Sequence, residues 1–259
     1  MDVPGISRPV LVVLIMATVG LLIGGGSWAL AWATRKSDTS SRTIPAVSTI
    51  EVDSTRSGDI KVIGSDRSDI RLTVKQHRSL FGRPHSKEQF SAGHLRLDGR
   101  CSEFELLGGD AACAISYRLE VPRGTTVELR ANSGDVSAID LGGDADLRTR
   151  SGDVQAIQVA GTSLHVETIS GDVHAITSAT SIDAGTTSGD VHVLASNPSH
   201  VRAHTVSGDV HVSVPDRSYA VTTHEVSGDA HVDVRTDPDA PRSIEATTTS
   251  GDVHVSRDG

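Results

Sequence analysis

The sequence of 259 residues is poor in aromatic side chains, in positive charge and in cysteine. Aromatic residues make up only 3% of the chain, and both tryptophans, Trp28 and Trp32, lie in its apolar N-terminal stretch. This scarcity disfavours a sugar cleft or small-molecule pocket with aromatic walls. The 24 Lys and Arg residues against 33 Asp and Glu give a net charge of −9. Such a balance excludes a nucleic-acid interface, which needs clustered cations.

Residues 10–33 contain no charged side chain. As a helix this stretch would be about 36 Å long, enough to cross a bilayer core. We therefore predict a short tail at 1–9, a single transmembrane helix at 10–33 and a linker at 34–46. The alternative is a cleaved secretory signal ending at Ala31-Trp32-Ala33. A signal should begin with a basic segment, whereas here Asp2 accompanies the single Arg8.

The side of the membrane is predicted from two opposing features. Arg35 and Lys36 follow the apolar stretch, and the positive-inside rule alone would place the C-terminal domain in the cytoplasm. The only two cysteines, Cys101 and Cys113, are spaced for a local disulfide, which persists in oxidising compartments. We therefore expect an extracytoplasmic C-terminal domain at the cell membrane. Two unpaired buried thiols are the alternative for these cysteines.

An internal repeat dominates residues 132–259. The tripeptide Ser-Gly-Asp occurs first at Ser57 and then seven more times, at intervals of 18, 19, 18, 19, 20 and 23 residues within this later series. The glycines are predicted to occupy tight corners, because glycine adopts positive φ without a Cβ clash. They are Gly134, Gly152, Gly171, Gly189, Gly208, Gly228 and Gly251.

Apolar residues alternate on both sides of each corner, which predicts two strands per repeat with one buried face each. Three residues after the serine stand Val136, Val154, Val173, Val191, Val210, Ala230 and Val253. Six before it stand Ala145, Leu164, Ile182, Val201, Val221 and Ile244. A repeat this short leaves no room for a βαβ crossover. We predict an all-β, single-stranded β-solenoid in which each coil hydrogen-bonds to the next in the chain.

Two parts of the chain depart from this regular pattern. Glu225 stands where the other repeats have threonine or another uncharged residue, so a bulge near residues 224–226 is predicted to turn it outward. Residues 47–131 alternate less regularly and are predicted to form opening coils or a cap, because a solenoid must protect its exposed end. Within them, residues 76–93 are polar and locally basic, and we expect an exposed loop.

The chain resembles the bacterial putative-adhesin family of β-strand-repeat proteins over roughly residues 47–259. The resemblance is carried by the recurrent Ser-Gly-Asp-Val turns behind an N-terminal apolar segment. Its most specific part is Cys113-Ala-Ile-Ser-Tyr-Arg-Leu-Glu-Val-Pro-Arg-Gly124, followed by Ser133-Gly-Asp-Val136. The resemblance implies a right-handed β-solenoid at the cell envelope with an adhesion or envelope-stress role. It implies no catalytic residues.

Stacking would align two polar rows outside the core. The first holds the aspartates of the corners, Asp135, Asp153, Asp172, Asp190, Asp209, Asp229 and Asp252, which are expected to cap the turn backbone. The second holds His174, His192, His211, His231 and His254, four residues after each serine and so facing outward. Imidazoles in such a row are candidate ligands for a transition metal, although an exposed polar repeat copied by duplication explains them equally well.

No unique nucleophile with an orienting partner stands out, because every coil carries the same Ser, Asp and His set. We therefore predict no enzyme activity and no cofactor. The leading hypothesis is a membrane-anchored, non-catalytic envelope protein that presents its solenoid surface to a protein, a wall polymer or another cell. A regulatory or sensory ectodomain in envelope stress is the second hypothesis, and a carbohydrate-active enzyme the third.

Overall fold

In the computed structural model, residues 36–78, 82–103 and 113–258 are described, and every regular element in these ranges is a β-strand. No helix within them is long and apolar enough to cross a membrane. The transmembrane helix predicted at 10–33 lies outside the described residues.

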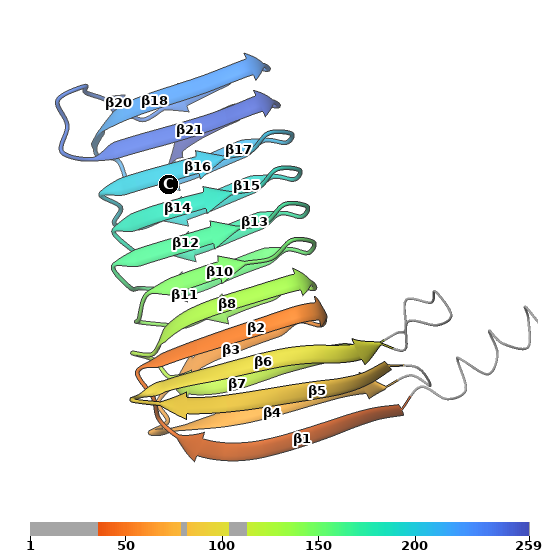
Figure 1. Ribbon diagram of the computed structural model, residues 1–259. Coiled ribbons are helices and arrows are strands. Elements are labelled where there is room, and N and C mark those ends of the chain that lie inside the picture. Colours follow the sequence, from red (N-terminus) through yellow and green to blue (C-terminus); the bar gives the residue numbers. More distant parts are fainter. Residues whose placement is uncertain (1–35, 79–81, 104–112, 259) are drawn as a thin grey trace, which may run out of the picture.

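The repeats form a narrow stack of coils, each contributing one strand to each of two sheets (Figure 1). Neighbouring strands within both sheets are parallel. Sheet 1 contains, in spatial order, β6 (His94–Glu103), β2 (Thr49–Ser57), β8 (Thr126–Ser133), β10 (Ala145–Arg148), β12 (Ser163–Glu167), β14 (Ser181–Gly185), β16 (His200–His204), β21 (Ser243–Ser250) and β18 (Ser218–Ser227).

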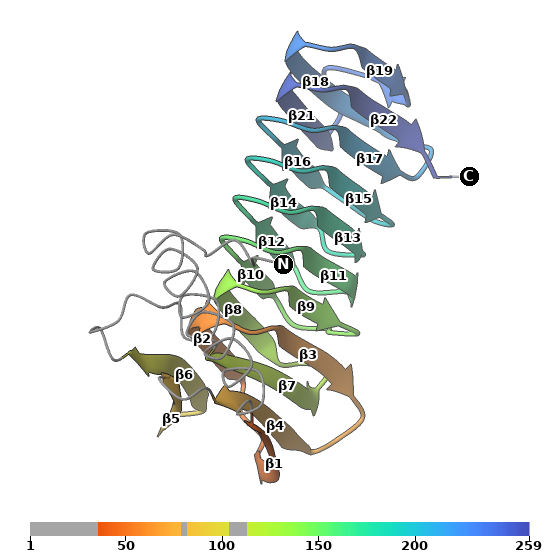
Figure 2. The same ribbon diagram turned by 90° about the vertical axis from the view of Figure 1, so that its right-hand side faces the viewer.

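Sheet 2 packs against sheet 1 and runs beside it along the whole stack (Figure 2). Its strands, in spatial order, are β7 (Ala114–Pro122), β3 (Ile60–Ser65), β9 (Val136–Ile139), β11 (Val154–Val159), β13 (Val173–Thr177), β15 (Val191–Ala195), β17 (Val210–Val214), β22 (Val253–Arg257) and β19 (Ala230–Asp233).

Equivalent residues of successive coils lie in register, as the repeat predicts. In sheet 2, Val173 pairs with Val191 and Val191 with Val210, and all three are fully buried. In sheet 1, Leu164 pairs with Ile182 and is likewise buried. The two inward faces form one continuous hydrophobic core. No single coil could bury this surface alone, so the stack is the unit of stability.

The coils do not all follow each other in chain order, which corrects the prediction. At the C-terminal end, the coil of Ser250 lies between those of Ser207 and Ser227. At the N-terminal end, the coil formed by β2 and β3 lies between the β6–β7 coil and the β8–β9 coil. The last coil in space is therefore the one built from β18 and β19.

The N-terminal part combines coils with antiparallel strands. Residues 36–45, predicted to lie in a linker, form β1 (Lys36–Pro45), which pairs antiparallel with β4 (Asp69–Arg78) along its whole length. β4 in turn pairs antiparallel with β7. The loop predicted at residues 76–93 is also wrong, because β4 extends into it and most of the remainder is β5 (Gly82–Ser91), which forms a hairpin with β6.

Glu225 corrects a further prediction. β18 stays in register with β21 at this position, where Glu225 pairs with Thr248, and no bulge occurs. Thr248 is buried, so the Glu225 side chain takes an inward position, half-buried at the open end of the stack. Its Oε2 atom is buried without a hydrogen-bond partner. The long intervals around it accommodate connections such as β20 (Arg235–Thr236), which pairs with the start of β18.

Candidate interaction face

The corners of the coils are held by two repeated hydrogen bonds. Each corner aspartate accepts the backbone N–H of the aspartate on the next coil, as Asp172 Oδ1 does from Asp190 N at 2.9 Å. Each buried threonine two residues before the serine donates to a glycine carbonyl on the preceding coil, as Thr186 Oγ1 does to Gly171 O at 3.0 Å. The row of aspartates therefore caps backbone N–H groups at the corners, as predicted.

The predicted row of histidines forms along the outer face of sheet 2. The ring centroids of His174 and His192 are 5.0 Å apart, and those of His192 and His211 are 4.9 Å apart. The row continues to His254 at 5.8 Å and ends at His231, a further 4.8 Å away. Each pair of neighbouring rings is stacked, with interplanar angles between 3° and 27°. The Nδ1 atom of His211 is buried without a hydrogen-bond partner.

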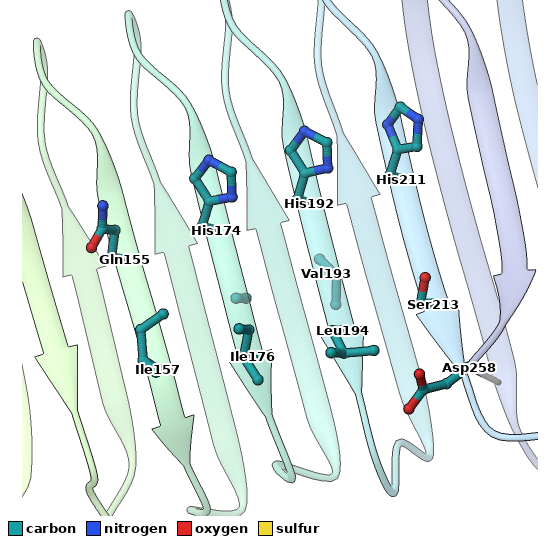
Figure 3. Close-up of a pocket in the computed structure, with 11 residues that line it drawn as sticks. Gln155, Ile157, His174, Ile176, His192, Val193, Leu194, His211, Ser213 and Asp258 are labelled. Carbon is teal, nitrogen blue, oxygen red and sulfur yellow. The ribbon is translucent and has the colours of Figure 1, made fainter.

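A second row, of aliphatic side chains, runs beside the imidazoles (Figure 3). It consists of Ile157, Ile176 and Leu194, which stand six residues after the serine of their repeats and point away from the core. Ile176 is 44% exposed. The aliphatic row and three of the histidines, His174, His192 and His211, line one shallow groove of about 680 Å³ on the outside of sheet 2. Gln155, Ser213 and Asp258 also line it.

The strand positions that carry this groove hold no permanently charged side chain. From β9 to β22 the outward residues are Ser137, Ile139, Gln155, Ile157, His174, Ile176, His192, Leu194, His211, Ser213, His254 and Ser256. We call this surface the uncharged face. Fixed charge lies at its borders, in the row of corner aspartates, at Arg257 and Asp258 at the end of β22, and on the adjoining strands.

The outer face of sheet 1 is the opposite in character. It carries ion pairs within and between strands, such as Arg148 with Asp146 on β10 at 2.7 Å and Arg202 on β16 with Glu245 on β21 at 3.2 Å. Most exposed pairs of this kind contribute little stability, so their main effect is to keep this surface hydrated. The two outer faces of the stack therefore offer a partner entirely different chemistry.

Three titratable groups meet on successive strands of this charged face. His165 Nδ1 lies 3.2 Å from Asp183 Oδ2, and His204 Nδ1 lies 4.0 Å from Asp183 Oδ1. The His204 ring lies over Gly185, where any side chain would collide with it. The hydrogen bond to Asp183 raises the pKa of His165, and the same bond lowers the pKa of Asp183.

Burial and the neighbouring rings both affect the pKa of His192, near the centre of the groove. Partial burial lowers the pKa of His192, and the neighbouring His211 and His174 lower it further, while Asp190 and Asp172 act weakly in the opposite direction. At neutral pH the face therefore stays uncharged at its centre. Among the described residues, no group of three or more His, Cys, Asp or Glu side chains is arranged to hold a metal ion. Metal binding by the row stays a prediction.

Two further features lie near the N-terminal end. Cys113 is buried and disulfide-bonded, while the side chain of Cys101 lies outside the described part, so their pairing stays a prediction. The β5–β6 hairpin carries a small cleft of about 230 Å³ lined by charged and imidazole side chains, His85, Lys87, Asp98 and Arg100. β5 makes up much of the polar stretch at residues 76–93, where a sensory ectodomain would be expected to contact its membrane partner.

Sequence reasoning found the histidine row but missed the aliphatic row and the His165–Asp183–His204 cluster. The signal was present in both cases, since strand residues of the same parity as the exposed histidines must also face outward. Apolar residues at such positions, like Ile176, mark a surface that a partner can cover.

The chain matches one protein family and is similar to several solved structures. The sequence profile of the Toastrack DUF4097 family matches residues 107–256. No curated protein matches the chain. Among solved structures, a putative cell adhesion protein from Clostridium sporogenes is similar at 10% identity, with a TM-score of 0.42, over 86% of this chain and 100% of that one. A putative adhesin from Bacteroides fragilis is similar at 11% identity, with a TM-score of 0.40, over 86% and 97%. A putative lipid binding protein from Parabacteroides distasonis is similar at 10% identity, with a TM-score of 0.41, over 85% and 96%.

Proposed function

The chain belongs to the Toastrack DUF4097 family, and we propose that it is a non-catalytic cell-envelope protein that presents the uncharged face of its solenoid for adhesive binding. The observation that carries this proposal is the contrast between the two outer faces. One holds ion pairs, whereas the other exposes a row of imidazoles on β13, β15, β17, β22 and β19 and a row of aliphatic side chains on β11, β13 and β15. An exposed apolar strip of this extent is typical of an interaction site.

The proposal includes the placement of the protein. A single-pass helix at 10–33 would anchor the chain, and a right-handed solenoid would project from the outer side of the membrane. The disulfide at Cys113 supports an oxidising compartment. The groove supports binding rather than catalysis, because its imidazoles are equivalent members of a row and none is paired with a nucleophile.

Site-specific photo-crosslinking in intact cells tests the proposal. A photoreactive amino acid replaces Ile176 on the uncharged face, Lys87 on the β5–β6 hairpin, or Thr222 on the outer face of sheet 1. We expect adducts at position 176 and none at position 222. Adducts confined to position 87 would instead favour the sensory alternative, and adducts at none of the three would refute an adhesive role. Protease added outside the cells should degrade the domain if it is extracytoplasmic.

A further inference from the structure

We propose that the uncharged face binds the same face of a second copy of this chain, side by side and pointing the same way. The inference rests on the proposed adhesive function and names its partner. Three observations support a second copy in particular, namely the charge of the surface, its period and the groups along its two borders.

The distribution of charge makes this face more suitable than the rest of the surface for contact between two copies. The chain carries a net charge of −9, so two copies repel each other at neutral pH wherever their acidic surfaces meet. Between β9 and β22 the outward strand positions contribute nothing to this repulsion. Ile176 and Leu194 also gain from leaving water. Two copies can therefore approach through this face without bringing like charges together at its centre.

The period of the face selects a partner with the same spacing. Successive imidazoles are about 5 Å apart because adjacent strands are separated by roughly 4.8 Å. An extended peptide lying along the groove would advance by about 3.3 Å per residue, so its side chains would not stay aligned with the strands of the groove. A second solenoid has the same strand spacing, so every coil of one copy can pack against a coil of the other.

A two-fold axis parallel to the stack makes the faces complementary. This rotation reverses the strand direction, so the imidazole row of one copy, around His192, lies over the aliphatic row of the other, around Leu194. At the levels of β13 and β15, the corner aspartates of one copy then lie over opposite turns of its partner that expose Ser178, Ser196 and Asn197. Hydroxyl and amide groups are suitable donors to carboxylates. The opposite turns of the other levels also carry carboxylates, of which Asp140 and Asp216 are paired with Arg123 and Arg235. Both copies point the same way, as two chains anchored in one membrane would.

The small area of the face predicts a dimer of low affinity. Six strands, each contributing about five residues, give a flat footprint of roughly 450 Å². Stable complexes bury about 800 Å² on each partner. Association should therefore be slight in dilute solution and become appreciable when an anchor confines both copies to one surface, where the effective concentration reaches the millimolar range.

The test is the oligomeric state of the full chain reconstituted in lipid vesicles, measured by chemical crosslinking over a series of protein densities. We expect a dimer band that grows with density. The double variant I176K/L194K should weaken it at least about tenfold, because it places lysines within the proposed contact. The matched control T222K/T247K adds two lysines on adjacent strands of sheet 1 and should leave the band unchanged. Circular dichroism melting checks that both variants fold.

Acid provides a second test, which needs no disruptive variant. Protonated imidazoles would lie against aliphatic side chains and repel one another, so the wild-type dimer should dissociate near pH 5. The groups that face His192 are His174, His211, Asp172 and Asp190. The variant H174Q/H192Q/H211Q removes the titrating groups, so the fraction of dimer that it forms should be the same at pH 5 as at pH 7.

A wild-type chain that stays monomeric at every density would overturn the inference, as would an equal loss of dimer in T222K/T247K. Acid resistance in the wild-type dimer would also count against the proposed contact. A monomeric chain that still forms adducts with other molecules at position 176 in cells would leave the adhesive function standing with a different partner.

Discussion

Replacement of Glu225 by threonine should stabilise the protein. In the coils of Ser151, Ser170, Ser188, Ser207 and Ser250, the residue two before the serine is a threonine whose hydroxyl donates to a glycine carbonyl, as Thr248 does to Gly208 O at 3.0 Å. Glu225 occupies the same place in the terminal coil, opposite Thr248, and the corner of that coil stacks on Gly251. The variant would supply the missing donor to the Gly251 carbonyl and remove the unpartnered Oε2.

The size of the effect follows from the hydrogen bond gained. A buried hydrogen bond contributes about 1 kcal/mol net, and removal of an unsatisfied polar atom adds up to a similar amount at this half-buried site. For a domain of this size, each kcal/mol corresponds to an increase in melting temperature of about 2–4 °C. Thermal melting followed by far-UV circular dichroism would measure it.

A matched variant isolates the hydroxyl. Glu225→Val removes the same carboxylate and has nearly the shape of threonine, but it cannot donate a hydrogen bond. We expect E225T to melt above E225V, and E225V to differ less from the wild type. If valine stabilises as much as threonine, the glycine carbonyl needs no donor at this coil and the account of the corner is wrong.

Three other predictions address the corners and the titratable groups. Gly189→Val should lower the free energy of unfolding by about 3 kcal/mol or more, because φ is +139° and a Cβ would lie 2.8 Å from Asp172 Oδ1 and overlap a backbone carbonyl. His192→Val should lower it by less than about 1 kcal/mol. Equal melting temperatures for the two variants would contradict the corner geometry. The pKa of His165 is raised in the folded state, so its contribution to stability is lost as the pH rises through that pKa. The pKa of Asp183 is lowered, so its contribution is lost as the pH falls through that pKa. The variant Asp183→Asn should therefore lower the melting temperature most between about pH 4 and 6.5, and less at pH 8. Zn²⁺ should leave the melting temperature unchanged, since stacked rings do not converge on one ion; a shift abolished by replacing both His192 and His211 would instead establish a metal site.

The coils could be predicted from the sequence because one short period fixes strand, corner and core together. Once Val173, Val191 and Val210 recur at the same offset from Ser-Gly-Asp, the alternation of a strand determines which residues face inward. The outward positions follow from the same rule. For this reason the sequence predicts the row of histidines.

The order of the coils could not be predicted in the same way. Every coil presents nearly the same hydrogen-bonding edge, so local sequence does not determine which two coils are neighbours. The chain leaves the coil of Ser207, skips one level to build the coil of Ser227, and returns to place that of Ser250 between them. In the sequence, this order is indicated only by the longer intervals of 20 and 23 residues, because a connection between coils that are not adjacent must be longer.

Duplication alone does not explain the uncharged face. A duplicated repeat initially has the same residues on both of its outward strand surfaces. If neither surface had a function, later substitutions should change the two to a similar degree. On sheet 1 one outward position reads Asp146, His165, Asp183, Arg202 and Glu245 through successive levels of the stack, so charge and size vary freely. On sheet 2 four successive levels keep histidine from His174 to His254, and four keep an aliphatic residue at the other outward position, from Ile139 to Leu194. One surface has therefore kept its chemistry while the other has not, although both are exposed to solvent and neither is needed for the core. The difference is expected if only the sheet 2 face meets a partner.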